Sequence, residues 1–125
     1  MAVQGNLEKH HAIEVVTWLN LATKQGKWWF HVPNERKCNP YHGYQLKLQG
    51  VHSGVSDFVF LRPANGYNFL VTELKANKKR KPTQEQLDFI ESVKLEGGWG
   101  EVLYGAKEAI KYIAEFYGLP TLGFI

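Results

Sequence analysis

Cysteine and long apolar runs are both scarce in this sequence. Cys38 is the single cysteine, so no internal disulfide can form, and a reducing compartment such as the cytoplasm is the simpler expectation. No apolar run approaches the roughly 18 residues of a membrane span, and the N-terminal stretch MAVQGNLEKHH has no apolar signal-peptide core. We therefore expect no membrane partner.

A large excess of one charge is also missing. Lys and Arg number 15 and Asp and Glu number 12, which gives a formal net charge of +3. This balance permits a nucleic-acid partner without demonstrating one. Because 44% of the residues are hydrophobic, the chain is expected to fold, and its 125 residues suit one domain, residues 1–125.

Zinc-ligand patterns are missing too. The chain has five histidines and one cysteine, but their spacing matches no recognised zinc site. We interpret them as surface histidines and an incidental thiol: His10, His11, His31, Cys38, His42 and His52.

Two predicted strands joined by a turn dominate the middle of the chain. The first strand spans residues 57–61 and the second spans residues 67–75. Between them, Asn65-Gly66 is a strong hairpin signal because both residues tolerate positive φ. Continuous apolar runs in both strands indicate a sheet that is covered on both faces.

Charged side chains mark the ends of these two strands. Antiparallel pairing about the turn brings Asp57 beside Glu73 and Lys75. Glu73 and Lys75 are two residues apart, so both point to the same face of the sheet. Two carboxylates and an amine at one strand end could bind a divalent metal with a cation beside it. The simpler alternative is a strand-end salt bridge on a solvated surface.

The N-terminal segment is predicted to form a helix from Leu7 to Thr23, with Asn6 as its N-cap. Apolar residues recur at helical spacing and define its buried stripe: Ala12, Val15, Leu19 and Ala22. Glu8 lies on this stripe, whereas Glu14 lies more than about 100° away, so Glu8 is the acid directed at the core. Glu8 also has a simpler explanation as a first-turn acid favoured by the helix dipole, and both can hold.

The other elements are short, and the predicted order is helix, three strands, helix, strand, helix. The patterns predict a strand at 27–32, an irregular polar segment at 34–54 with one helical turn near 44–49, a helix at 83–96, a strand at 101–104 and a helix at 106–117. A polar segment as long as 34–54 is usually functional or mobile. Thr83-x-x-Gln86 is a capping-box pattern, which gives Gln86 a structural explanation.

A basic loop directly follows Glu73-Leu74-Lys75. Its four consecutive cations are Lys78, Lys79, Arg80 and Lys81. Such runs are most often simply solvated. This one is predicted to lie beside the carboxylates, where a phosphate backbone could use it.

Asp57 at the start of the second strand and Glu73-Leu74-Lys75 at the end of the third give this order of elements a known resemblance. It is similar to the PD-(D/E)XK nuclease core, which implies an α/β fold with a mixed central sheet flanked by helices, extended here by a C-terminal helix. More closely, the chain resembles the VRR-NUC (virus-type replication-repair nuclease) family, particularly its small stand-alone members of phage type.

Several segments carry this resemblance, which covers nearly the whole chain: Glu8, His31–Asn34, Leu46–Asp57, Glu73–Ala76, Gln86 and Tyr104-Gly105. Their order and spacing are more specific than any one of them. Two features depart from the family pattern. Ser56 stands where a proline usually precedes the strand Asp, and the basic run is denser than the family requires.

The resemblance implies a metal-dependent site. Asp57, Glu73, the Leu74 carbonyl and Glu8, directly or through water, would hold Mg²⁺ or Mn²⁺, with no organic cofactor. Lys75 would orient the attacking water or neutralise developing charge, and Gln86 would support Lys75 or the water network. DNA phosphates would contact the basic residues: Lys78, Lys79, Arg80 and Lys81, with Arg36 and Lys47 as weaker candidates.

Three functional hypotheses follow. The resemblance favours a DNA endonuclease selective for branched or junction DNA in replication, repair or recombination, acting as a homodimer in the cytoplasm (the host cytoplasm if the chain is phage-encoded). A catalytically silent DNA-binding module would be expected to lack one of Asp57, Glu73 and Lys75, all of which are present. A protein-interaction domain with an incidental acidic cluster predicts neither metal dependence nor affinity for DNA.

Overall fold

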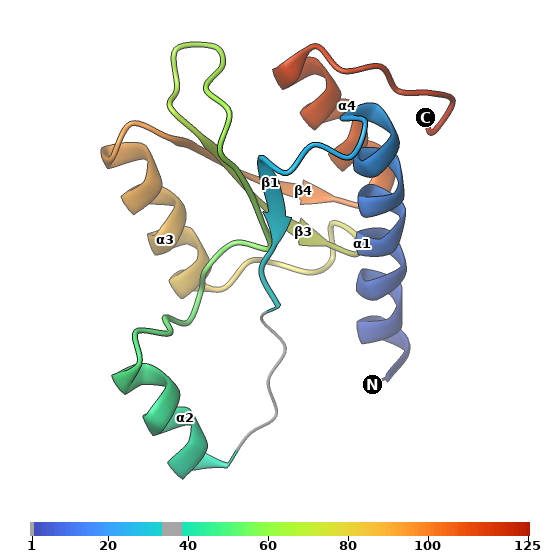
Figure 1. The fold of residues 1–125 in the computed structure, drawn as a ribbon. Coiled ribbons are helices and arrows are strands. Elements are labelled where there is room, and N and C mark those ends of the chain that lie inside the picture. Colours follow the sequence, from blue (N-terminus) through green and yellow to red (C-terminus); the bar gives the residue numbers. More distant parts are fainter. Residues whose placement is uncertain (1, 34–38) are drawn as a thin grey trace.

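The computed structural model describes residues 2–33 and 39–125 of the chain (Figure 1). Its elements follow in the order α1 (Ala2–Ala22), β1 (Trp29–His31), α2 (Pro40–Leu48), β2 (Phe58–Phe60), β3 (Leu70–Lys75), α3 (Gln84–Leu95), β4 (Trp99–Tyr104) and α4 (Ala106–Tyr117). The predicted α/β class and order are confirmed, with α2 as an additional helix between β1 and β2. No helix in the described ranges is long and apolar enough to cross a membrane.

The four strands form one mixed sheet in the order β1-β2-β3-β4. The pairs β1–β2 and β2–β3 are antiparallel, and β3–β4 is parallel. At the predicted turn, Asn65 and Gly66 have φ of 55° and 85°, and Ala64 pairs with Tyr67. The hairpin is therefore confirmed, although β3 begins at Leu70, three residues later than predicted.

Helices cover both faces of the central strands. Figure 1 shows α1 and α4 together on one side of the sheet and α3 on the other. The core between the sheet and α1/α4 includes Phe58, Phe60, Leu70, Leu74 and Leu103. Every residue of β3 is buried, so that strand is covered on both faces as predicted.

The outer part of the sheet is less covered than the apolar runs indicate. Phe30 of β1 is 45% exposed, and Leu61, which follows β2, is 56% exposed. Phe30 is paired with Val59 and lies with Leu61 on the face opposite Phe58 and Phe60, the face on which α3 packs over β3 and β4. The expectation of two covered faces is therefore wrong for this part of the sheet.

Helix α1 begins earlier than predicted. It starts at Ala2, so Asn6 lies inside the helix and is not its N-cap. The preceding residues tolerate helical geometry, and Asn within a helix costs only a few tenths of a kcal/mol to about 0.7 kcal/mol. The predicted stripe is buried at Val15, Leu19 and Ala22, and it is widened by Trp18, whose indole N–H donates to the Pro120 carbonyl at 2.9 Å.

Helix α2 is longer than the single turn predicted near residues 44–49. The side chain of Asn39 caps it by accepting a hydrogen bond from the His42 N–H at 2.7 Å, and Pro40 occupies its first turn. Asn followed by Pro is a helix-start signal, so this start was readable from the sequence. The full extent of the helix was missed because it has no apolar stripe that faces a core.

Helices α3 and α4 match their predicted ranges closely. The capping box at Thr83 and Gln86 is complete, and Gly118 ends α4 with a left-handed φ of 68°. Ile90 and Val93 of α3 are buried, whereas Leu87, three residues before Ile90, is 39% exposed. Because α4 has no side-chain cap of its own, His11 of α1 supplies one to its first residue, Ala106.

Candidate active site

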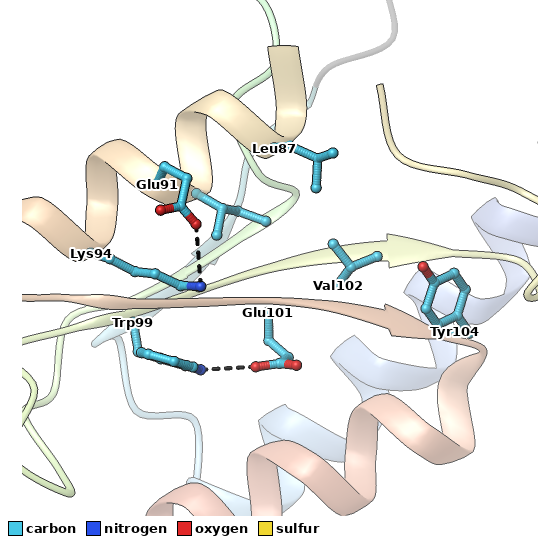
Figure 2. Close-up of a pocket in the computed structure, with 9 residues that line it drawn as sticks. Leu87, Glu91, Lys94, Trp99, Glu101, Val102 and Tyr104 are labelled. Atoms are coloured by element: carbon cyan, nitrogen blue, oxygen red, sulfur yellow. Dashed lines mark hydrogen bonds and ion pairs between the residues drawn. The ribbon is translucent and has the colours of Figure 1, made fainter. Parts of the chain in front are cut away.

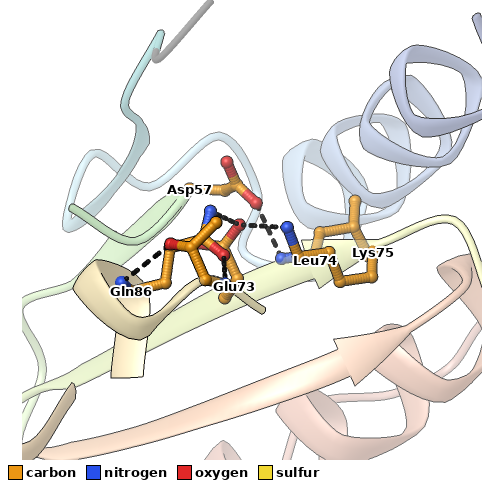
Figure 3. A network of polar contacts seen from close by, with 6 residues as sticks. Asp57, Glu73, Leu74, Lys75 and Gln86 are labelled. Atoms are coloured by element: carbon orange, nitrogen blue, oxygen red, sulfur yellow. Dashed lines mark hydrogen bonds and ion pairs between the residues drawn. The ribbon is translucent and has the colours of Figure 1, made fainter. Parts of the chain in front are cut away.

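Glu73, in β3, is the centre of a network of polar contacts at one end of the sheet (Figure 3). Its side-chain oxygen Oε2 accepts a hydrogen bond from Gln86 Nε2 at 3.0 Å and lies 3.6 Å from Lys75 Nζ. Its other oxygen, Oε1, is buried and has no hydrogen-bond partner in the described part of the chain. The residue is only 3% exposed and Lys75 only 9%, so the alternative of a solvated surface salt bridge is wrong.

Asp57 lies directly before β2 and opposite this network. The β2–β3 register pairs Phe58 with Thr72, and its continuation places Asp57 opposite Glu73. The Asp57 carboxylate accepts a hydrogen bond from the Leu74 N–H at 2.7 Å, and its carbonyl accepts one from the Val32 N–H at 2.7 Å. The residue is thus held by β3 through its side chain and by the end of β1 through its backbone.

The two carboxylates affect each other strongly. The pKa of Glu73 is raised from 4.5 to about 8, chiefly by burial and next by the negative charge of Asp57. The Lys75 ammonium lowers this pKa, while a hydrogen bond to Asp57 and the charge of Glu8 raise it. Without a bound cation, Glu73 therefore carries a proton near neutral pH.

The carbonyl of Leu74 points toward the same space as Asp57. In a strand, the N–H and C=O of one residue point to the same side, and successive residues alternate. The Lys75 carbonyl accepts a hydrogen bond from the Gly105 N–H at 2.8 Å, on the β4 side. The Leu74 N–H reaches Asp57, so its carbonyl is directed away from β4 and toward the carboxylates.

Gln86 makes structural and site contacts at once. Its Oε1 accepts a hydrogen bond from the Thr83 N–H at 2.8 Å, which completes the capping box. Its amide nitrogen is free to donate to Glu73, as described above. The N-terminus of α3 is therefore tied to the buried carboxylate by the same side chain that caps it.

Glu8 makes the weakest contribution to the electrostatics of this centre. It is half-buried on α1, and its charge contributes least among the causes that raise the Glu73 pKa. Within residues 2–33 and 39–125, no three His, Cys, Asp or Glu side chains lie close enough together to hold one metal ion. Glu8 is thus an electrostatic neighbour of Glu73 and does not form a three-carboxylate cluster with Asp57.

The loop before Asp57 packs on the start of α3. Ser53 Oγ donates to Glu85 Oε2 at 3.0 Å. Gly54 has φ +83°, and a Cβ there would lie 2.6 Å from the Glu85 carbonyl oxygen. Ser56 is 1% exposed, and its Oγ has no hydrogen-bond partner among the described residues. No sequence signal indicated this buried hydroxyl.

The basic residues are exposed and lie on two segments. Lys78, Lys79, Arg80 and Lys81 are exposed in the loop after β3, where Asn77 Oδ1 accepts a hydrogen bond from the Lys79 N–H at 2.9 Å and shapes the turn. Lys47 is exposed on α2. Arg36 lies outside the described residues.

A separate groove lies outside the network of polar contacts around Glu73. A groove of about 530 Å³ lies between α3 and β4, lined by residues such as Leu87, Trp99 and Tyr104 (Figure 2). Trp99 donates from its indole N–H to Glu101 at 2.8 Å, and Lys94 lies over the Trp99 ring. Asp57, Glu73 and Lys75 do not line this groove, so we do not assign it to the carboxylate site.

The fold and the site together define a class. The mixed sheet with helices on both faces is an α/β fold, with Asp57 before its second strand and Glu73-Leu74-Lys75 at the end of its third. Among solved structures, the chain is similar to one described as a VRR_NUC domain protein, with a TM-score of 0.78 and 22% sequence identity. The match covers 90% of this chain and 88% of the other. The sequence matches no family model and no curated protein.

Proposed function

We propose that this chain is a metal-dependent deoxyribonuclease of the VRR-NUC type that hydrolyses phosphodiester bonds. One observation carries the proposal: a buried carboxylate oxygen of Glu73 has no hydrogen-bond partner among the residues that the structure describes, and Asp57 and the buried ammonium of Lys75 flank this carboxylate. Burial of an unpaired carboxylate costs several kcal/mol unless a cation or a proton compensates it. The likeness to a VRR_NUC domain protein supports the same class.

The donor atoms fit a hard divalent cation. Asp57, Glu73 and the Leu74 carbonyl offer only oxygen, the donor type that Mg²⁺ and Mn²⁺ prefer, and Glu8 would act through water. A bound cation would supply Lewis-acid stabilisation of the phosphate and would make a water molecule more acidic.

The remaining chemistry belongs to this chain's own side chains. Lys75 is held beside Glu73 in a buried position. Its ammonium would orient the attacking water and neutralise charge that develops on the phosphate. Gln86 fixes Glu73 by its 3.0 Å hydrogen bond and so keeps Oε1 directed at the site. The Leu74 N–H holds Asp57 in the same way.

DNA would be held through its phosphates. The exposed cations after β3 (Lys78, Lys79, Arg80 and Lys81) follow Lys75 directly, with Lys47 and Arg36 as weaker contacts. Such contacts give affinity that falls with salt and carry no sequence information.

We further propose a preference for branched or junction DNA in replication, repair or recombination. One site cuts one strand, so cutting both strands of a junction requires two sites and favours a homodimer, which sedimentation of the purified protein would detect. A single cysteine and the predicted nuclease role support a cytoplasmic location.

The first experiment compares cleavage of labelled single-stranded, duplex, flap and four-way-junction DNA with Mg²⁺, with Mn²⁺ and with EDTA. Glu73→Gln is the matched variant, because a neutral amide has nearly the shape of the protonated carboxyl and should preserve the fold. Cleavage that requires metal and disappears in this variant supports the proposal. DNA binding without cleavage by either protein, in either metal, would instead indicate a silent DNA-binding module.

A further inference from the structure

Helix α2 presents an aromatic face that nothing in the described chain covers. Tyr41, Tyr44 and Leu48 are 72%, 59% and 64% exposed. Their spacing of three and seven residues places them on one side of the helix. Figure 1 shows α2 standing apart from the sheet and from the other three helices.

Intrachain packing does not explain this helix. None of its nine residues, all of them described by the structure, is buried. Isolated helices shorter than about 12–15 residues are marginal in water, so a short helix normally depends on packing of one face. The cap by Asn39 defines where α2 begins but supplies no such packing.

The charge around α2 favours an anionic partner. Residues 39–56 contain no Asp or Glu, and they carry Lys47, His42 and His52. Lys47 lies in the last turn of the helix, next to Leu48. A segment with exposed aromatic rings, a lysine and no acids suits nucleic acid, whose bases stack on such rings while its phosphates repel acids.

The segment is also fixed to the proposed active site at its C-terminal end. Ser53 and Gly54 pack on Glu85 of α3, and the adjacent Gln86 donates to Glu73. Three residues after Gly54 the chain reaches Asp57. The segment that carries α2 therefore ends at the carboxylates where DNA would bind.

The small size of the face argues against a second copy of this chain. A nine-residue helix is about 14 Å long and about 10 Å wide. A stable protein–protein interface needs about 800 Å² from each partner, several times what one side of such a helix offers. One or two bases, in contrast, need only the area of one or two aromatic rings.

We propose that Tyr41 and Tyr44 stack on unpaired bases of the DNA held at the active site, with Leu48 packing beside them and Lys47 contacting the adjacent phosphate. The inference rests on the proposed function and names its substrate class: DNA with unpaired bases near the cut strand, as at a flap or an open junction. Matched duplex lacks bases that can reach these rings.

The test compares Tyr41→Ala/Tyr44→Ala with the matched variant Tyr41→Phe/Tyr44→Phe, which keeps the rings. Binding is measured in EDTA, where no cleavage occurs, by fluorescence anisotropy with a flap DNA and a fully paired duplex. Stacking is worth about 1–3 kcal/mol per base, so the alanine variant should bind the flap at least about tenfold more weakly. Binding to the duplex should change less than about twofold, and the phenylalanine variant should resemble the wild type. A 2-aminopurine base in the flap should lose its fluorescence quenching only with the alanine variant.

Each other outcome contradicts the inference. Equal loss on both DNAs, or no loss on either, would show that the rings do not read unpaired bases. If the wild type is a dimer and the alanine variant is a monomer, the aromatic face of α2 is a subunit interface. If the wild type cleaves flaps with Mg²⁺ but the alanine variant binds and cleaves them unchanged, only this inference fails. If the wild type binds and cleaves no DNA, the proposed function fails with it.

Discussion

The imidazole of His11 accepts a hydrogen bond through Nδ1 from the backbone N–H of Ala106, 95 residues later in the chain, at 3.0 Å. Ala106 is the first residue of α4, whose N-cap position is Gly105 and has no side chain to offer. The Gly105 N–H in turn donates to the Lys75 carbonyl at the end of β3. One short segment therefore joins α1, α4 and the active-site strand.

Two substitutions of His11 should distinguish the contribution of its hydrogen bond to stability from that of its side-chain volume. His11→Ala leaves the first N–H of α4 without its partner and should lower the free energy of unfolding by about 1 kcal/mol, the usual value of a lost cap. His11→Asn places an oxygen near the position of Nδ1 and should recover most of the loss. Urea unfolding measures both, with the exposed neighbour His10→Ala as the control. Equal effects of the Ala and Asn variants would contradict the capping role.

The stability of the metal-free protein should fall as pH rises. The pKa of Glu73 is about 8 in the folded chain against an ordinary value of 4.5, so between these pH values the folded state binds more protons than the unfolded state. The stabilising contribution is complete below about pH 4.5 and is lost as pH rises through 8, at a scale of about 1.4 kcal/mol per pKa unit. Urea unfolding in EDTA from pH 5 to 9 should show this decline in the wild type. Glu73→Gln should show a flatter profile, and parallel profiles would refute the assignment.

Gln86 allows its capping role to be separated from its contact with Glu73. Gln86→Glu keeps a carboxylate oxygen for the Thr83 N–H but places a second acid against Glu73 Oε2. We expect nearly unchanged stability and at least about a tenfold loss of cleavage rate, since a tenfold loss needs only about 1.4 kcal/mol of misplaced charge. Thr83→Ala is the converse control, because it should cost about 1 kcal/mol of stability and little activity. Full activity in Gln86→Glu would exclude a role in the site.

Two glycines with similar backbone angles differ in what surrounds them. Gly54→Ala adds a Cβ 2.6 Å from the Glu85 carbonyl oxygen, whereas Gly50→Ala, at φ +93°, meets nothing within 4 Å. Both variants carry backbone strain of about 1–2 kcal/mol, but only Gly54→Ala must move the loop off α3. It should unfold at lower urea and cleave more slowly, because that loop ends at Asp57. Indistinguishable variants would show that the contact with Glu85 does not position the loop.

The basic loop should control the salt dependence of binding. Each of Lys78, Lys79, Arg80 and Lys81 that contacts a phosphate should reduce the slope of log Kd against log salt by about 1 when changed to Ala, on duplex and flap DNA alike. Lys107→Ala and Lys111→Ala, exposed on α4, are the controls and should leave the slope unchanged. A similar reduction in the control variants would indicate only a general charge effect.

Local patterns predicted those features whose causes are local. The Asn65-Gly66 turn fixed the hairpin, and the hairpin register placed Asp57 opposite Glu73 and Lys75. The capping box predicted the start of α3. The side chain of Gln86 in this box also reaches Glu73, and no local pattern contains that contact between segments.

Features that depend on distant contacts or on their absence were missed or misplaced. The face of Glu8 was readable from helical spacing, but its separation from Asp57 depends on how α1 docks. The extent of α2 was missed because prediction from apolar periodicity assumes that a helix has a core to face, and α2 has none. The exposure of Phe30 likewise follows from its position at the sheet edge, which the sequence does not state.

Residues 39–56 are attached to the rest of the fold at the two ends of the segment. Helix α2 can therefore change without a change in the site around Glu73. The sheet pairs β1 with β2 whatever lies between them, and Gly54 fixes the far end on α3. A longer, shorter or exchanged helix at α2 would leave the carboxylates and Lys75 where they are. If the proposed roles hold, this segment is the place to graft a different DNA-recognition element without altering the site around Glu73.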